Sequence, residues 1–536
     1  MLIEPAESYP KTGGLVMADI VLINPRFEVS YWGMEHALPF LGKRANLPVA
    51  CLPLLAALTP PEHTVTLMDE NVEAINYERC AQADIVGVTG MSVQRFRMKE
   101  ILTELKRRGC FTAGGGPLVT VQEEYFDGIA DVIFVGEAEE TWPQFLKEWP
   151  HRLHQYRYEQ INKSDMTKLP TPRFDLLKMR HYAFGSLQFS RGCPFQCEFC
   201  DIIVTFGRRP RLKSVDQVIR EIDALWAQRM RIVFIVDDNL IGNKKAIKDV
   251  LRAVARWQEE HEYAVTFVTE ASIDLADDPE LMELMVAANI TATFVGIESP
   301  NEASLRETKK FQNVREGGTM LEKVHRIQDA GLEVWCGMIM GFDNDDSSIF
   351  DAQINFVQEA QIPHSMSGML HAIAKTPLHA RLAEEGRLDP SDTPEFGTNV
   401  IPLKLGREEL QEGYVRVMNE IYAPDRYFSR LEDLWIDRNF TFGRSRNEYY
   451  RKHPLARLKS ELLSLTLTIG LFTRLMRGIT EAHLKAEYRR RLWRYLKYTR
   501  NPGKVFSYTL KMALHYHAYT MATQMKSGRS QVYNSW

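Results

Sequence analysis

The stretch Arg191-Gly-Cys-Pro-Phe-Gln-Cys-Glu-Phe-Cys-Asp201 decides how this chain is interpreted. It places Cys193, Cys197 and Cys200 at the spacing C-x3-C-x2-C. Three thiolates can hold three irons of a [4Fe–4S] cluster and leave the fourth iron open to a substrate. A structural zinc site usually takes four ligands, often from two C-x2-C pairs, and no matching pair follows here. The spacing therefore favours an iron–sulfur cluster over zinc.

The length and cysteine usage bound the class of protein. A chain of 536 residues predicts about three domains, and 45% hydrophobic with 25% charged residues is typical of a globular protein. Four further cysteines, Cys51, Cys80, Cys110 and Cys336, are scattered. Their scatter favours a reducing compartment and a cytoplasmic location. Residues 1–16 carry no signal-peptide pattern and are expected to be a disordered extension.

Residues 17–150 alternate short apolar runs with helical stretches. The runs at 20–25, 64–69, 84–89, 111–117 and 131–137 each end near a turn-forming residue. This alternation predicts an α/β domain with a doubly wound, Rossmann-like parallel sheet. Ligands of such sheets bind beyond the carboxyl ends of the strands. Gly114, Gly115 and Gly116 fall at such an end, where a backbone without Cβ atoms lets a bulky ligand approach.

The central region repeats the alternation. Residues 151–180, with Pro170 and Pro172, are expected to form a linker, and strands and helices resume over 181–400. In barrels built from parallel strands, the functional residues lie at the carboxyl ends of the strands. Polar candidates fall at those ends: Asp237, Asp238, Asn239, Glu270, Glu298, Ser299 and Asp343. An alternative role for the carboxylates is to cap helices or to pair with Arg208, Arg209 and Arg211.

The cysteine spacing, with Gly192 and Phe199, resembles the radical S-adenosylmethionine (SAM) superfamily. The resemblance implies a partial (βα)6 TIM-type barrel and SAM bound to the open iron. Reductive cleavage of SAM then gives a 5′-deoxyadenosyl radical, with electrons from a donor such as flavodoxin or ferredoxin. The candidate SAM contacts are Asp237, Asp238, Glu270, Glu298, Ser299, Gly337 and Gly341. The sequence departs from the family where Asp237-Asp238 replaces the more widespread Gly-Gly-Glu.

The domain upstream of the cysteines resembles a cobalamin-binding domain. Its local matches are Gly90-Met-Ser-Val, Gly114-Gly-Gly-Pro and Val135-Gly-Glu-Ala-Glu. The Asp-x-His-x-x-Gly motif, whose histidine ligates cobalt in many such proteins, is absent. His36 follows the first strand and is interpreted as a loop histidine rather than a cobalt ligand. A degenerate domain that binds no cobalamin is the alternative.

Residues 401–536 are expected to form a helical, basic C-terminal domain. Residues 451–536 hold 17 lysines and arginines against three acidic residues, although the whole chain has a net charge of −4. The segment 489–500 interleaves cations with aromatic residues, which favours peripheral contact with the inner face of a membrane. A solvated or packed helix is the alternative, and nucleic acid is less favoured. The apolar run at 462–472 is too short to span a bilayer.

Taken together, the chain resembles B12-binding radical SAM proteins with a C-terminal helical extension. In architecture and in its basic tail it is similar to hopanoid C-2 methylases. The resemblance implies methylation of an unactivated carbon in a lipid or other hydrophobic substrate. Two alternatives stay open: a radical SAM cyclase or carbon–carbon coupling enzyme, and a cobalamin or redox sensor.

Overall fold

A computed structural model describes residues 17–529, so the extension expected at 1–16 lies outside the described residues. The chain divides into two compact units. The first unit takes the chain up to Glu28, Leu47–Gln188 and Arg211–Met230. The second takes Val29–Asn46, Phe189–Pro210 and the chain from Arg231 onward. The domain borders expected from the sequence remain predictions.

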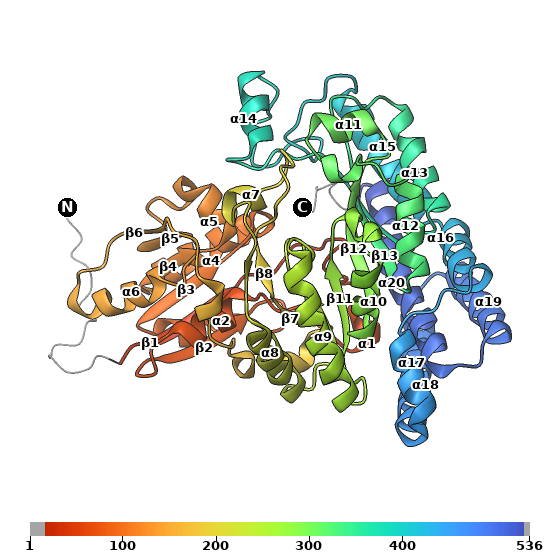
Figure 1. The fold of residues 1–536 in the computed structure, drawn as a ribbon. Helices are drawn as coiled ribbons and strands as arrows, with labels where there is room; N and C mark the ends of the chain where they lie inside the picture. Colours follow the sequence, from red (N-terminus) through yellow and green to blue (C-terminus); the bar gives the residue numbers. More distant parts are fainter. Residues whose placement is uncertain (1–16, 530–536) are drawn as a thin grey trace. The chain divides into compact units, whose positions relative to one another are not determined.

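The first unit is built on a parallel sheet of six strands. Their order is β2-β1-β3-β4-β5-β6, so the strand order reverses beside β1. The strands are β1 (Asp19–Asn24), β2 (Thr64–Asp69), β3 (Ile85–Thr89), β4 (Thr112–Gly115), β5 (Val132–Gly136) and β6 (Arg157–Gln160). The predicted doubly wound sheet is confirmed (Figure 1). β6 falls within the expected linker and was not predicted.

Helices pack on this sheet in two pairs. α2 (Cys51–Leu58) contacts α6 (Thr141–Glu148), and α3 (Tyr77–Ala81) contacts α4 (Arg95–Arg107). In α4 the apolar residues follow the helical period, and Met98, Ile101, Leu102 and Leu105 are all buried. Each such side chain contributes about 1.5–3 kcal/mol when it leaves water. The sheet is therefore fixed by this apolar face rather than by its exposed ion pairs.

The second unit holds another parallel sheet, in the order β14-β13-β12-β11-β10. Its strands are β10 (Ile232–Ile235), β11 (Thr266–Glu270), β12 (Ile290–Glu298), β13 (Glu333–Met340) and β14 (His364–Met369). The helices α9 (Lys244–Glu260), α10 (Pro279–Ala287), α12 (Met320–Asp329) and α13 (Ser348–Glu359) lie between them in the chain. The predicted strand–helix repeat is confirmed, and the carboxyl ends of these strands meet at one edge of the sheet.

The C-terminal helices belong to the same unit as this sheet. They are α15 (Arg407–Ile421), α16 (Pro424–Glu432), α17 (Arg444–Lys452), α18 (Pro454–Gly478), α19 (Ala482–Tyr498) and α20 (Pro502–Lys526). α15 packs on α13 and β14, and α20 contacts α15, α18 and α19. Arg430 is fully buried and donates to the carbonyls of Ile362 (2.7 Å) and Pro363 (3.3 Å). This arginine ties α16 to the chain entering β14.

The helical C-terminal region is thus confirmed. Within residues 17–529 no helix combines the length and the apolar character needed to cross a bilayer.

Candidate functional site

The three cysteines lie on one loop of the second unit, directly after β8 (Ser190–Arg191). All three are free thiols. Gly192 opens the loop at φ +95°, and a Cβ there would lie 2.9 Å from the Gly207 carbonyl oxygen. Glycine is therefore required where the loop passes its own returning backbone. Burial raises the pKa of the Cys193 and Cys200 thiols, so these sulfurs ionise readily only with a cationic partner or a metal.

Two aspartates after β10 hold the entrance of this loop. Asp237 is buried and accepts hydrogen bonds from the backbone N–H of Phe189 (2.7 Å) and Ser190 (2.8 Å). It also accepts from the Ser190 hydroxyl at 2.6 Å. Asp238 accepts from the Gly192 N–H at 2.7 Å. Both carboxylates thus fix the backbone that leads into the cysteines.

Three carboxyl groups gather at the ends of β10 and β11. Burial raises the pKa of Asp238 to about 7, and repulsion from Asp237 adds to the shift. Burial likewise raises the pKa of Glu270 to about 8, with repulsion from Asp238 and Asp237. A cation bound here would favour the ionised carboxylates and lower these pKa values. This cluster of carboxyl groups therefore favours a cationic ligand.

Two side-chain amides reach the cysteine sulfurs. The Gln312 Nε2 lies 3.5 Å from the Cys197 Sγ, and the Asn239 Nδ2 lies 3.9 Å from the Cys193 Sγ. The Asn239 amide is oriented by Ser272, whose N–H donates to its Oδ1 at 3.2 Å. N–H donors at cluster sulfurs are a main lever on cluster potential. The amides fit a cluster bound by these thiolates. Sequence reasoning missed Gln312, which no local motif marks.

Glu298 ends β12 in a left-handed conformation, with φ +65°, where the pairing of β12 with β13 shifts register. The side-chain amide of Asn313 donates to the carbonyls of Gly296 (2.9 Å) and Ile297 (2.8 Å) and holds this bend. Strained residues of this kind persist where surrounding contacts determine them, often at functional sites. The bend aims Glu298 at Lys310.

Lys310 is a largely enclosed cation, 12% exposed, beside the cysteine loop. Its Nζ lies 2.6 Å from the Glu298 Oε1 and 5.8 Å from the centre of the Phe199 ring. Burial alone would lower the pKa of Lys310, but Glu298 and the thiols of Cys197 and Cys200 raise it overall. The lysine is therefore charged and offsets negative charge at the cysteines.

The remaining candidates of the second unit have local structural roles. Ser299 is buried, and its hydroxyl accepts from the Asn301 N–H at 3.1 Å. Gly337 pairs with Gly296 inside the sheet. Gly341 has φ +99°, and a Cβ there would lie 2.8 Å from a Leu410 methyl carbon. Close packing explains this glycine without a ligand.

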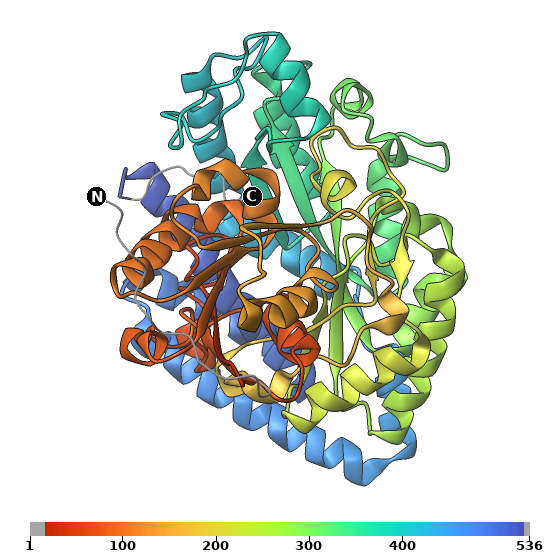
Figure 2. The same cartoon turned by 90° about the vertical axis from the view of Figure 1, so that its left-hand side faces the viewer.

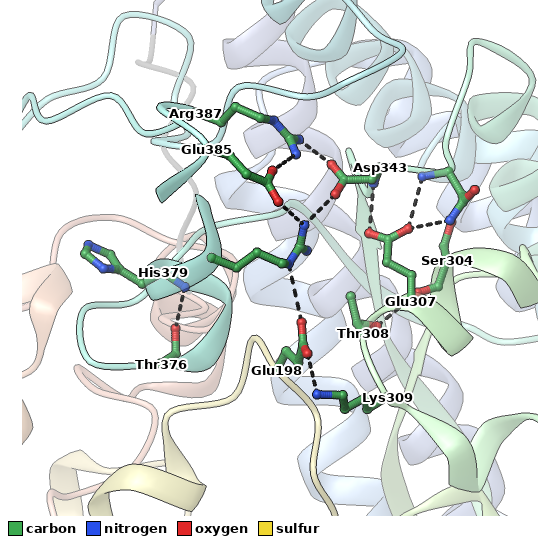
Figure 3. Close-up of polar contacts among 12 residues, drawn as sticks. Glu198, Ser304, Glu307, Thr308, Lys309, Asp343, Thr376, His379, Glu385 and Arg387 are labelled. Carbon is green, nitrogen blue, oxygen red and sulfur yellow. Dashed lines mark hydrogen bonds and ion pairs between the residues drawn. The ribbon is translucent and has the colours of Figure 1, made fainter. Parts of the chain in front are cut away.

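Charged side chains clamp the middle of the cysteine loop (Figure 3). The N–H of Glu198 donates to the Thr308 carbonyl at 3.0 Å, and its carbonyl accepts from the Leu378 N–H at 3.1 Å. Its carboxylate lies 2.7 Å from the Lys309 Nζ and 3.6 Å from the Arg381 Nε. Hydrogen bonds thus fix the backbone of Glu198, and ion pairs fix its side chain.

The same network continues to the end of β13. Asp343 pairs with Arg381 at 2.8 Å and with Arg387, while Glu307 accepts from the Asp343 N–H at 3.0 Å. Burial acts to raise the pKa of Asp343, but pairing with Arg381 and Arg387 lowers it overall. Asp343 is therefore a link between the cysteine loop and α14 (Pro377–Glu384) rather than a free ligand.

In the first unit the three glycines differ in what they do. Gly116 has φ +98°, and a Cβ there would lie 2.5 Å from the Thr89 Oγ1. At Gly114 and Gly115 the nearest atoms to an added Cβ are 3.7 Å away. Gly116 is thus required by the turn, whereas an added Cβ at Gly114 or Gly115 would make only ordinary packing contacts, at Gly114 with the core residues Ala130 and Ile133. Contact between cobalamin and the carboxyl end of β4 stays a prediction.

His36 does not belong to the first unit. Its backbone N–H donates to the His517 Nδ1 at 3.3 Å, and the two rings lie 5.5 Å apart. The loop after β1 is therefore committed to the C-terminal helices within the second unit.

Comparison with known families matches two segments. Residues 187–352 match the model described as "Radical SAM superfamily". Residues 376–531 match "Domain of unknown function (DUF4070)". The cysteine loop and β10–β13 fall in the first segment, and α14 to α20 fall largely in the second.

Two relatives match over most of their length. The chain is 40% identical over 416 residues to "Uncharacterized methyltransferase sll1242" of Synechocystis sp., covering 76% of this chain and 77% of the relative. It is 30% identical over 521 residues to "Hopanoid C-2 methylase" of Rhodopseudomonas palustris, covering 96% and 95%. Among solved structures, the cobalamin-dependent SAM radical enzyme OxsB matches with a TM-score of 0.59 at 13% identity, covering 96% of this chain and 82% of OxsB. That likeness supports the fold.

Proposed function

This chain belongs to the radical SAM superfamily, and on that premise we propose methylation of an unactivated carbon in a lipid or other hydrophobic substrate. The relation to a hopanoid C-2 methylase over 95% of its length supports the proposal. It also makes a hopanoid-like lipid the first substrate to test. The cofactors are a [4Fe–4S] cluster, SAM and cobalamin.

The observation that carries the proposal is the cysteine loop held at the carboxyl end of β10. We assign Cys193, Cys197 and Cys200 as ligands of three irons. Asp237 and Asp238 fix the backbone before them. Three such thiolates would hold three irons and leave the fourth for SAM.

The cofactors divide the chemistry. The SAM methyl group is an electrophile, so a carbon that is neither acidic nor nucleophilic cannot attack it directly. When bound, the cluster with SAM supplies a hydrogen-abstracting radical, and cobalamin supplies a methyl carrier. The chain binds and orients these groups. Asp238 and Glu270 would attract the ammonium of SAM, Lys310 would balance cluster charge, and the turn at Gly114, Gly115 and Gly116 is the place proposed to contact cobalamin.

The test is product analysis with protein reconstituted anaerobically with iron, sulfide and cobalamin. The protein is given SAM, a flavodoxin or ferredoxin as electron donor, and a membrane-lipid extract. We expect sustained formation of both 5′-deoxyadenosine and S-adenosylhomocysteine, measured by mass spectrometry. Cys197→Ala should abolish both products, whereas Cys110→Ala, a cysteine outside the loop, should retain them. Deoxyadenosine without S-adenosylhomocysteine would replace the methylase by a cyclase or coupling enzyme.

A further inference from the structure

α18 carries a stripe of apolar side chains that is left uncovered within the described residues. Leu455, Leu458, Leu462, Leu465 and Ile469 are 83, 54, 56, 48 and 60% exposed. Their spacing of three and four residues places them on one side of the helix. At 100° per residue the five side chains fall within an arc of about 80°, over a length of about 21 Å.

The opposite side of the same helix packs in its C-terminal half, while Leu463 and Leu467 on that side remain 54 and 42% exposed. Thr468, Leu471 and Leu475 are buried. α18 makes its contacts with α20, α17 and α1 (Leu38–Leu41), all in the second unit. Figure 2 shows α18 as the long blue helix along the lower edge of the view. The stripe is thus the outward face of a helix that is anchored from behind.

Two exposed cations, Lys459 and Arg477, lie along one margin of the stripe, both about 80° from its centre around the helix axis. Lys459 is 81% exposed and lies 3.7 Å from the Glu262 carboxylate. Glu461, the single acidic residue of α18, lies on the other margin and pairs with Arg457 at 2.7 Å. A leucine face with lysine and arginine along its margin fits a helix lying in a lipid interface.

The segment 489–500, expected from the sequence to contact a membrane, buries Arg491, Leu492 and Tyr495 and leaves Leu496 and Tyr498 each 39% exposed. In α19 the guanidinium of Arg491 pairs with Glu432 at 2.9 Å and with Glu487 at 2.6 Å. Trp493 remains 63% exposed. The wide apolar surface is therefore on α18 and not on α19.

A second copy of the chain is a poorer occupant. In a two-fold dimer the same patch meets itself, so two surfaces of the same net positive charge would be brought together. The region from Arg451 to the end carries 17 basic and three acidic residues. An anionic lipid surface instead attracts this charge.

We infer that the α18 stripe seats the protein on an anionic lipid surface, with Leu458, Leu462 and Leu465 in the acyl boundary and Lys459 and Arg477 at the headgroups. This surface requires neither cluster nor methyl transfer, and its test is independent of the reaction. If the substrate is a lipid, as proposed above, this surface would hold the protein at the membrane that contains it.

The experiment is sedimentation of the full-length protein with vesicles of phosphatidylcholine, with and without phosphatidylglycerol. The test variant is Leu458→Gln/Leu462→Gln/Leu465→Gln, which keeps helix propensity and side-chain length. The matched control is Leu153→Gln/Ile161→Gln/Leu403→Gln, which replaces three aliphatic residues exposed by 69, 81 and 64% elsewhere. Circular dichroism checks that both variants fold.

We expect the wild type and the control to bind vesicles that contain phosphatidylglycerol. The test variant should lose about tenfold or more in partition coefficient, because three half-exposed leucines no longer enter the lipid. Hydrogen exchange of α18 should slow in the wild type when these vesicles are added. Equal binding by the test variant would overturn the inference. So would a wild type that ignores vesicles but is dimeric by light scattering, with a monomeric test variant.

Discussion

Replacing Lys310 with methionine removes the cation that pairs with Glu298 beside the cysteine loop. The two side chains are 12 and 9% exposed, and their charged atoms lie 2.6 Å apart. Removal of one partner of a buried pair leaves the other charge uncompensated and costs about 3–5 kcal/mol. We therefore expect Lys310→Met to loosen the end of β12, where Glu298 already holds a strained conformation.

The assay is hydrogen exchange of β12 peptides in the metal-free protein under reducing conditions. Because the chain has two compact units, local exchange is better defined than one global unfolding transition. The expected cost corresponds to exchange that is about 100-fold faster or more, at 1.36 kcal/mol per tenfold. The double variant Lys310→Met/Glu298→Gln removes both charges and should recover most of this loss.

The matched control is Arg306→Met, which breaks an ion pair with Glu302 on α11 (Glu302–Glu307). These side chains are 57 and 60% exposed, so the control should cost less than about 0.5 kcal/mol. The reasoning is refuted if Lys310→Met exchanges no faster than Arg306→Met. It is also refuted if the double variant is as labile as the single one, since the cost would then come from packing rather than charge.

Three further changes test separate parts of the structure. Gln312→Leu removes an N–H donor from the Cys197 sulfur. Because such donors stabilise the reduced state of a cluster, the reduction potential should fall by about 20–60 mV in a redox titration of reconstituted protein. An unchanged potential would contradict a role for Gln312 in setting the cluster potential. Gly116→Ala should destabilise the first unit by about 2–3 kcal/mol in thermal unfolding. The control Gly109→Ala should cost about 1 kcal/mol, because Gly109 also has a positive φ but an added Cβ there would meet no atom within 4 Å. Equal effects would show that the contact with Thr89 is unimportant. Burial lowers the pKa of His515 and of His517 to about 3, so between pH 6.5 and 3 the unfolded state binds more protons and stability falls as the pH falls. From pH 7 to 5 each histidine should cost about 2 kcal/mol, and in urea titrations His515→Gln should show a shallower decline than the wild type.

Much of the fold could be predicted because each strand carries its own signal. The apolar runs expected at 20–25 and 131–137 coincide with β1 and β5 to within a residue. Such runs are buried on both faces of a parallel sheet and need no partner to be recognised. β6 was missed because Arg157-Tyr-Glu-Gln160 alternates exposed and buried residues at the sheet edge and reads as polar. An edge strand such as β6 buries only one face, so only every second residue is apolar and the strand is harder to recognise.

The cysteines could be predicted for the same reason, because their spacing along the chain is itself the signal for a cluster site. Lys310 and Gln312 were not found, because each meets the cysteine loop from more than 100 residues away along the chain. A lysine and a glutamine after a short helix have no pattern of their own. Only the fold brings them to the sulfurs.

The polar residues at the strand ends show how the site is built. Their position predicted ligand contacts, and several of them instead make the structure that would present a ligand. Asp237 is saturated by the backbone of Phe189 and Ser190, and Asp343 is held by two arginines. Asp238 and Glu270 differ, because burial and mutual repulsion raise their pKa values to about 7 and about 8. A carboxyl group held in that unfavourable state gains most from a cationic ligand. Asp238 and Glu270 are therefore the positions at which substitution by the neutral amide should weaken SAM binding, whereas substitution of Asp237 should first disorder the loop.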